Sequence, residues 1–107
     1  FSREQQAMLA VILRNQRRKL RGKQFKVLAP ERRQLALQLT ILLRIALTLN
    51  RARAEDAAPP VKVIRASKHH LDLLFPERWL DTHPLTRADL EEEAEYLERV
   101  DLELKFR

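Results

Sequence analysis

The chain has 107 residues, of which 45% are hydrophobic and 34% charged, a composition that supports one ordinary domain or two small ones. The absence of cysteine excludes disulfides, thiolate catalysis and zinc–thiolate sites, and it fits a reducing compartment such as the cytoplasm. The net charge of +6 is uneven, because residues 1–53 hold 13 Lys and Arg against 2 Asp and Glu, whereas residues 54–107 hold 8 against 13.

A first helix is predicted from Ser2 to about Lys19. Ser2 and Gln5 have the spacing of a capping box, in which each side chain bonds a free backbone amide of the helix start. Apolar residues at helical spacing then predict one buried face, formed by Met8, Leu9, Ile12 and Leu13. The segment from Gly22 to Ala29 has no clear period and is predicted to be a loop.

Pro30 suits the first turn of a second helix, which is predicted to reach about Arg53. Its most apolar side is formed by Leu35, Leu39, Leu42, Leu43, Ala46 and Leu49. Further apolar residues at Leu37, Ile41 and Ile45 widen this stripe, which predicts a central, mostly covered helix. Arg44 in the middle of the stretch argues against a membrane span.

Residues 54–60 form the clearest boundary, since two prolines and a small acidic turn end the helix. The period then changes to the alternation of strands over 61–66 and 70–75, with a link short enough for a hairpin. Thr86 and the following acids predict a third helix, with Leu90, Ala94 and Leu97 buried. Residues 101–107 alternate again and predict a last strand that pairs with the hairpin.

These elements predict an α+β fold. Residues 1–53 hold two long helices, residues 54–60 form a linker, and residues 61–107 form a small β-β-α-β domain.

The densest chemical signal is a run of cations at the end of the first helix and in the following loop. Its members are Arg14, Arg17, Arg18, Lys19, Arg21, Lys23 and Lys26, and no acid lies between Glu4 and Glu31. Lysine and arginine bind phosphate oxygens, and so many of them create a strong local positive potential. The alternative is a solvated face that complements the negative end of the helix dipole. The scarcity of aromatic residues near the run favours a phosphate polymer without bases over nucleic acid.

Catalytic and metal sites lack comparable support. The adjacent His69 and His70 point to opposite faces of a strand, and His83 stands in a connector, so turn positions explain the three histidines. The acids of residues 91–95 face several directions around a helix and form a solvated surface. With one glycine and no cysteine, neither a glycine-rich phosphate loop nor a thiol nucleophile is present.

Several stretches resemble the exopolyphosphatase/guanosine pentaphosphate phosphohydrolase family. In the last third they are Leu74-Phe75-Pro76-Glu77-Arg78-Trp79-Leu80, His83-Pro84-Leu85-Thr86, Asp89-Leu90-Glu91 and Glu93-Ala94-Glu95-Tyr96-Leu97. The middle helix, with Leu42-Leu43-Arg44-Ile45-Ala46 and Leu49-Asn50-Arg51-Ala52-Arg53, and the opening Phe1-Ser2-Arg3-Glu4-Gln5-Gln6 are similar to the same family. The resemblance covers essentially the whole chain in order.

This resemblance implies that the chain is the C-terminal region of a longer enzyme, which agrees with a first residue that is Phe1 and not methionine. The catalytic domains, of the actin/sugar-kinase type, would lie upstream and use magnesium. Residues 1–53 would be the end of an HD-like helical domain and residues 61–107 the small terminal α+β domain. In the family these domains are thought to hold inorganic polyphosphate and to contribute to a homodimer. We therefore expect no catalytic residue, metal or cofactor in this chain itself.

One departure leaves the branch of the family open. Many exopolyphosphatases place an aromatic–histidine pair just before the basic run, whereas this chain has Asn15 and Gln16 there. That pair looks more like the guanosine pentaphosphate branch, while the dense Arg17-Arg18-Lys19 favours polyphosphate. We predict that phosphates are bound by Arg14, Arg17, Arg18, Lys19, Arg21 and Lys23, joined by Arg51 and Arg53 if the two helices pack antiparallel.

Overall fold

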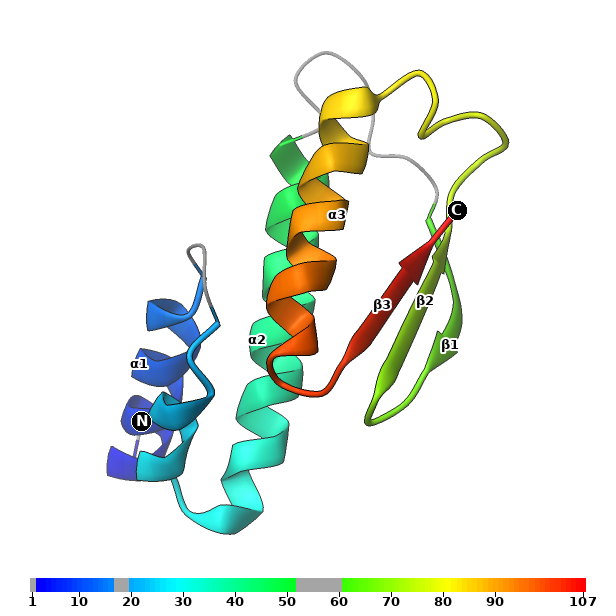
Figure 1. Ribbon diagram of the computed structural model, residues 1–107. Coiled ribbons are helices and arrows are strands. Elements are labelled where there is room, and N and C mark those ends of the chain that lie inside the picture. Colours follow the sequence, from blue (N-terminus) through cyan, green and yellow to red (C-terminus); the bar gives the residue numbers. More distant parts are fainter. Residues whose placement is uncertain (1, 17–19, 52–60) are drawn as a thin grey trace. The chain divides into compact units, whose positions relative to one another are not determined.

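The structure is a computed structural model that describes residues 2–16, 20–51 and 61–107 (Figure 1). The chain forms two compact units, Phe1–Arg44 and Ile45–Arg107. The elements follow the order α1 (Arg3–Arg14), the 3₁₀ helix η1 (Gly22–Val27), α2 (Pro30–Arg51), β1 (Lys62–Ala66), β2 (His70–Leu74), α3 (Pro84–Glu98) and β3 (Glu103–Phe106). The predicted α+β fold, with a β-β-α-β order after the helices, is confirmed. The predicted linker at residues 54–60 lies outside the described residues and stays a prediction.

The start of α1 is confirmed and its end is not. Ser2 Oγ accepts from the Gln5 amide at 3.1 Å, and Gln5 Oε1 accepts from the Ser2 amide at 2.9 Å, so the capping box is complete. The helix ends at Arg14, short of the predicted Lys19, because Asn15 is its C-cap and donates from Nδ2 to the Val11 carbonyl at 2.8 Å. A side chain that bonds a helix carbonyl in this way competes with continuation of the backbone ladder.

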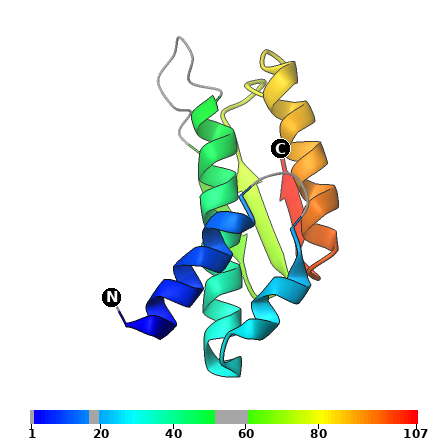
Figure 2. The same cartoon turned by 90° about the vertical axis from the view of Figure 1, so that its left-hand side faces the viewer.

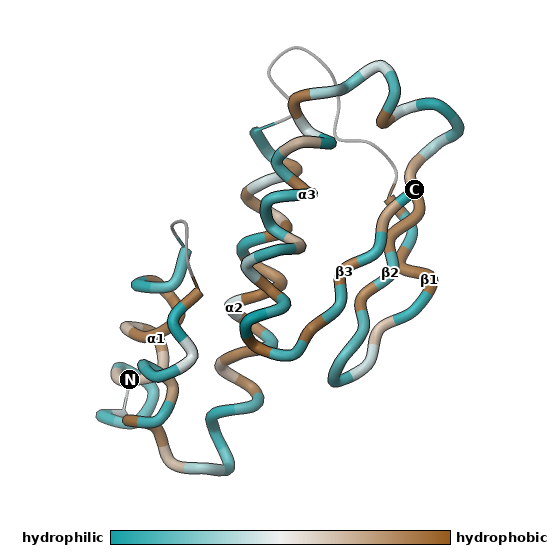
Figure 3. The backbone as a smooth tube through the Cα atoms, in the orientation of Figure 1, coloured by the Kyte–Doolittle hydropathy of each residue, from teal (hydrophilic) through white to brown (hydrophobic). Residues whose placement is uncertain are grey.

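The buried faces of the two long helices differ from the predicted faces. In α1, Val11 and Ile12 are buried, whereas Leu9 and Leu13 are exposed. In α2 the buried positions recur every four residues as Ala36, Thr40, Arg44 and Thr48, with Ile41 and Ile45 beside them. The predicted apolar side of α2 is instead turned outward, as Leu35, Leu39, Leu42 and Ala46 are exposed. Figure 3 shows hydrophobic residues all along α2, so hydropathy alone leaves the choice of buried face open.

Within the first unit, α1 runs parallel to the part of α2 that belongs to the same unit (Figure 1). Glu4 near the start of α1 pairs with Arg32 near the start of α2, at 3.0 Å between Oε2 and Nη2. At the other end, Arg44 Nη1 donates to the Asn15 carbonyl at 2.7 Å. The antiparallel packing considered from the sequence is therefore wrong, because the start of α1 lies beside the start of α2 and the end of α1 lies beside Arg44.

The segment after α1 also contains more regular structure than its irregular sequence predicts. Residues 22–27 form η1 and do not form a simple loop. Phe25 and Leu28 are buried there, so this short helix contributes to the core of the first unit.

The second unit contains a three-stranded sheet in the order β1-β2-β3. β1 pairs with β2 antiparallel, with a bulge between Val63 and Arg65, and β3 pairs with β2 in parallel. Leu71 and Leu73 of β2 and Leu104 of β3 are buried on one face, as their alternation predicts. The alternation of hydrophobic and hydrophilic residues along β3 is visible in Figure 3.

Helix α3 connects the two parallel strands and lies alongside β3 (Figure 2). It begins at Pro84, two residues before the predicted Thr86, because proline has the backbone angle and the missing N–H that suit a first helical position. The acids therefore lie beyond the first turn, which contains none, and Thr86 and Glu93 are buried with Leu90 and Leu97. After the helix, Asp101 has a left-handed φ of 60°, and the Leu102 amide bonds the Leu97 carbonyl at 3.1 Å, which turns the chain into β3.

Candidate functional site

Residues 14–26, which we call the basic segment, carry seven cations: Arg14, Arg17, Arg18, Lys19, Arg21, Lys23 and Lys26. The structure describes Arg14, Arg21, Lys23 and Lys26, and all four are exposed. Within residues 2–16, 20–51 and 61–107 no acid forms an ion pair with any of these four side chains. Their charges are therefore available to an anion from outside the chain.

Buried apolar side chains hold residues 20–28 against the rest of the first unit. Leu20, Phe25 and Leu28 are all buried, and they alternate with the exposed Lys23 and Lys26. Burying three large side chains from nine residues fixes the backbone to which the lysines are attached. The local pattern of apolar residues inward and cations outward presents positive charge on a structured surface.

Other arginines of the first unit are used by the fold. Arg33 clamps the end of η1, since its Nε donates to the Leu28 carbonyl at 2.9 Å and its Nη2 to the Lys26 carbonyl at 3.0 Å. Arg44 is only 3% exposed and donates to the Asn15 carbonyl. A buried guanidinium needs such carbonyl partners because desolvation of an unpartnered charge is costly. Sequence reasoning assigned neither role, although a lone arginine in an apolar helix was the available signal for Arg44.

The structure thus describes only some of the eight residues that the sequence predicts to bind phosphate. Arg14, Arg21 and Lys23 lie on the exposed basic segment of the first unit. Arg51 belongs to the second unit, where its Nη2 donates to Thr48 Oγ1 at 3.3 Å. Arg17, Arg18, Lys19 and Arg53 lie outside the described residues. The combination of all eight into one binding surface remains a prediction.

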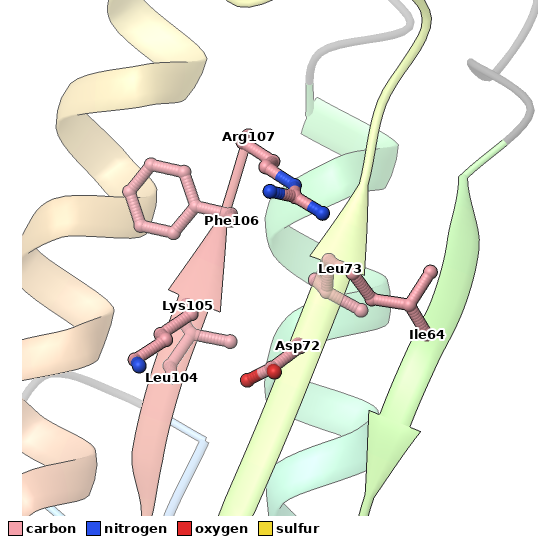
Figure 4. Close-up of a pocket in the computed structure, with 7 residues that line it drawn as sticks. All are labelled: Ile64, Asp72, Leu73, Leu104, Lys105, Phe106 and Arg107. Carbon is pink, nitrogen blue, oxygen red and sulfur yellow. The ribbon is translucent and has the colours of Figure 1, made fainter.

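A separate pocket of about 540 Å³ lies on the sheet of the second unit and is drawn in Figure 4. Its lining residues are Ile64, Asp72, Leu73, Leu104, Lys105, Phe106 and Arg107. Asp72 lies between Arg65 and Lys105 in the strand register, and its Oδ1 is buried without a hydrogen-bond partner among the described residues. The lining combines the Asp72 carboxylate with the cations Lys105 and Arg107, so the pocket suits a polyanion less well than the basic segment, which contains no acid.

The three histidines lie at separate structural positions. His69 Nδ1 lies 3.0 Å from the Asp101 carbonyl, and His70 Nδ1 lies 3.5 Å from a Glu103 carboxylate oxygen. His83 stacks on Trp79, with 3.8 Å between ring centroids, and Trp79 stacks in turn on Phe75 at 5.2 Å. In the parts of the chain that the structure describes, no three histidine or carboxylate side chains gather as a metal-ligand set. The family resemblance implies magnesium in the upstream catalytic domains, and we derive no metal-dependent step from the residues of this chain.

None of the helices within the described ranges has the length and hydrophobicity needed to cross a membrane. Even α2, with 22 residues, carries Arg44 on its buried side.

A comparison with protein families shows to which family this chain is related. Residues 1–94 match the family described as Ppx/GppA phosphatase, domain III. This chain belongs to the Ppx/GppA phosphatase family. The match begins with α1, contains the whole basic segment and extends through β1 and β2 into α3 of the Ppx/GppA chain. The resemblance stated from the sequence is confirmed, and the family's activity as phosphatases directs attention to phosphate-bearing partners.

Proposed function

We propose that this chain is a non-catalytic, C-terminal part of an exopolyphosphatase and that its basic segment binds inorganic polyphosphate. The Ppx/GppA family assignment supports a phosphate-bearing partner. Catalysis and the magnesium that assists it are assigned to the N-terminal domains of the parent enzyme, in the cytoplasm. The role of this region is to hold the polymer while orthophosphate is released elsewhere.

The observation that carries the proposal is a set of exposed cations without acidic partners. Arg14, Arg21, Lys23 and Lys26 are exposed, and none of them is neutralised within the described residues. A linear polyphosphate carries about one charge per phosphate, so neighbouring phosphates can contact neighbouring cations of the segment at the same time. Arginine adds bidentate bonds, which a lysine cannot form with a single phosphate.

A remote anchor of this kind would make hydrolysis processive. A long polymer that stays bound to the basic segment returns its shortened end to the catalytic site at a high effective concentration. Short polymers cannot span both sites and lose this advantage. The affinity of this protein for polyphosphate should therefore rise with polymer length until the polymer contacts every cation of the basic segment.

The test measures the dissociation constant for long-chain polyphosphate by isothermal titration calorimetry at several salt concentrations. Neutralised phosphates release counterions, so affinity is expected to fall steeply as salt rises, by analogy with other linear polyanions. The double substitution Arg21→Glu with Lys23→Glu should weaken binding at least tenfold at low salt, and Arg17→Glu with Arg18→Glu should do the same.

Arg99→Glu serves as the matched control, because Arg99 is an exposed arginine without an ion pair in the described second unit. Unchanged affinity in both double variants would contradict the proposal. Stronger binding of guanosine pentaphosphate than of polyphosphate would assign the chain to the guanosine pentaphosphate branch.

A second candidate function, dimerisation, is favoured by the outward-facing leucines of α2. Leu35, Leu39 and Leu42 are spaced to lie on one side of the helix and are between 39% and 57% exposed. A row of exposed leucines on a helix is a common feature of interfaces between protein subunits. We propose a second copy of the chain as the occupant, in agreement with the homodimer expected from the family.

Sedimentation equilibrium with and without polyphosphate separates the two candidates. A dimer that binds no polyphosphate supports the assembly role alone, and a monomer that binds it supports the anchor role alone. Leu39→Lys should shift a dimer to monomer, whereas Leu85→Lys, at an 82% exposed position of the second unit, should leave it unchanged. A dimer unaffected by Leu39→Lys would exclude this face as the interface.

A further inference from the structure

Asn15 makes more hydrogen bonds than its position at a helix end requires. Its side chain is 1% exposed, and all three of its bonds are short. Oδ1 accepts from the Arg21 amide at 2.8 Å, while Nδ2 donates to the Val11 carbonyl at 2.8 Å and to Gln24 Oε1 at 2.9 Å. Both donor hydrogens and the acceptor oxygen of the carboxamide are therefore used.

The backbone of Asn15 extends the same network to α2. Its carbonyl accepts from Arg44 Nη1 at 2.7 Å, and Arg44 is itself buried. Asn15 thus links four parts of the first unit: the end of α1, the residue before η1, η1 itself through Gln24, and α2. No other residue that the structure describes in the basic segment has this arrangement.

The bonds of Asn15 hold the backbone that carries two described cations. Oδ1 binds the Arg21 amide and Nδ2 binds Gln24, and Lys23 lies between these two partners in the sequence. A backbone held by hydrogen bonds at both ends of a short stretch has fewer conformations than a free one. Binding a polymer to cations whose backbone is already restrained costs less conformational entropy than ordering a free chain.

We propose that Asn15 is a positioning residue that acts through Arg21 and sets the spacing of the cations Arg21 and Lys23 for polyphosphate. This inference rests on the proposed polyphosphate binding and adds a residue that carries no charge and touches no phosphate. Asparagine is required because aspartate has no donor for the Val11 carbonyl or for Gln24 Oε1, and an aliphatic side chain leaves the Arg21 amide without its acceptor.

The experiment is a double-mutant cycle with Asn15→Ala and Arg21→Gln, read out as polyphosphate affinity over a range of salt concentrations. Asn15→Ala should weaken binding by between about two- and tenfold, the equivalent of one hydrogen bond. It should also lower the slope of log affinity against log salt by about one, since one cation no longer meets its phosphate. In the Arg21→Gln background the effect of Asn15→Ala on the slope should disappear.

Thr40→Val is the matched structural control. Thr40 is fully buried in the same unit, and its Oγ1 donates to the Ala36 carbonyl at 2.7 Å. Its bond from Gln16 Nε2 goes to the backbone carbonyl, which the substitution keeps. Thr40→Val should lower thermal stability and leave the salt slope unchanged. If the role of Asn15 were merely structural, Asn15→Ala would have the same two effects. If Asn15→Ala does not fold, Gln24→Ala removes one partner of the Asn15 side chain and should lower the slope in the same direction.

The possible failures are distinguishable. Absence of polyphosphate binding by the unaltered protein would overturn the proposed function. Binding by the unaltered protein together with an unchanged salt slope in folded Asn15→Ala and Gln24→Ala would overturn the role of Asn15 and leave the proposed function intact.

Discussion

At the scale of single residues, the arginines of the first unit fall into two groups that composition cannot separate. Arg14 and Arg21 are exposed and their guanidinium groups have no ion pair within the described residues. Arg33 and Arg44 donate to backbone carbonyls at the ends of η1 and α1. The first group can serve a ligand, whereas the second group holds the backbone in place.

This division predicts different costs for the same substitution. Arg44→Met should lower the free energy of unfolding by about 2–3 kcal/mol, because the Asn15 carbonyl loses a bond from a charged donor. Arg14→Met should change it by less than about 0.5 kcal/mol, since an exposed side chain without a partner is removed. Urea denaturation of both variants provides the measurement, and equal losses would contradict the assignment of roles.

At the scale of elements, their order could be predicted from the sequence and their orientation could not. The capping box, the two prolines at helix starts and the alternation of β2 and β3 are local signals, and the structure contains the corresponding elements. The buried side of α2 depends on its partner α1, because leucines and isoleucines occur all around the helix. The helix buries Thr40 and Arg44, whose polar groups have bonding partners there, and exposes Leu39 and Leu42.

The candidate site could also be predicted only in part from the sequence. Its charges are visible in the sequence, because seven cations occur without an intervening acid. The bonds that hold them are not visible, because Asn15, Gln24 and Arg44 meet only after α1 and α2 pack in parallel. Nothing in the local spacing of these three residues indicates that they share one network.

Two neighbouring residues of α2 test the orientation of the helix. Ile41 is 5% exposed and Leu42 is 57% exposed, although the sequence pattern places Leu42 on the more apolar side. Ile41→Ala should lower the free energy of unfolding by about 2–4 kcal/mol, and Leu42→Ala should lower it by less than 1 kcal/mol at low protein concentration. A loss in Leu42→Ala that grows with protein concentration would indicate that this face is buried in a dimer.

At the scale of the whole molecule, the basic and acidic parts of the sequence lie mostly in different compact units. The basic segment lies in the first of the two compact units, while the acids of α3 lie in the second. A polyanion should therefore interact with one unit and be repelled by the acidic helix of the other. Polyphosphate binding is therefore expected to depend on the first unit and not on the sheet of the second unit.

Hydrogen–deuterium exchange with added polyphosphate measures this separation. Ligand binding should slow amide exchange in peptides that cover residues 14–28, because ligands stabilise the conformation that they bind. Exchange in peptides that cover β2 and β3 should stay within error of the unliganded chain. Slowing confined to the sheet peptides would place the ligand on the pocket of Figure 4 and contradict the proposed surface.

The parallel pairing of β2 with β3 has a consequence for the order of folding. β1 and β2 are joined by a short turn and can meet within microseconds, whereas Leu71 meets Leu104 only after α3 has formed and packed. Until then the apolar side chains of β2 are uncovered at an open sheet edge, which is the situation in which chains aggregate. During this delay, mutual repulsion between the exposed cations Lys62, Arg65 and Lys68 should keep newly made hairpins apart.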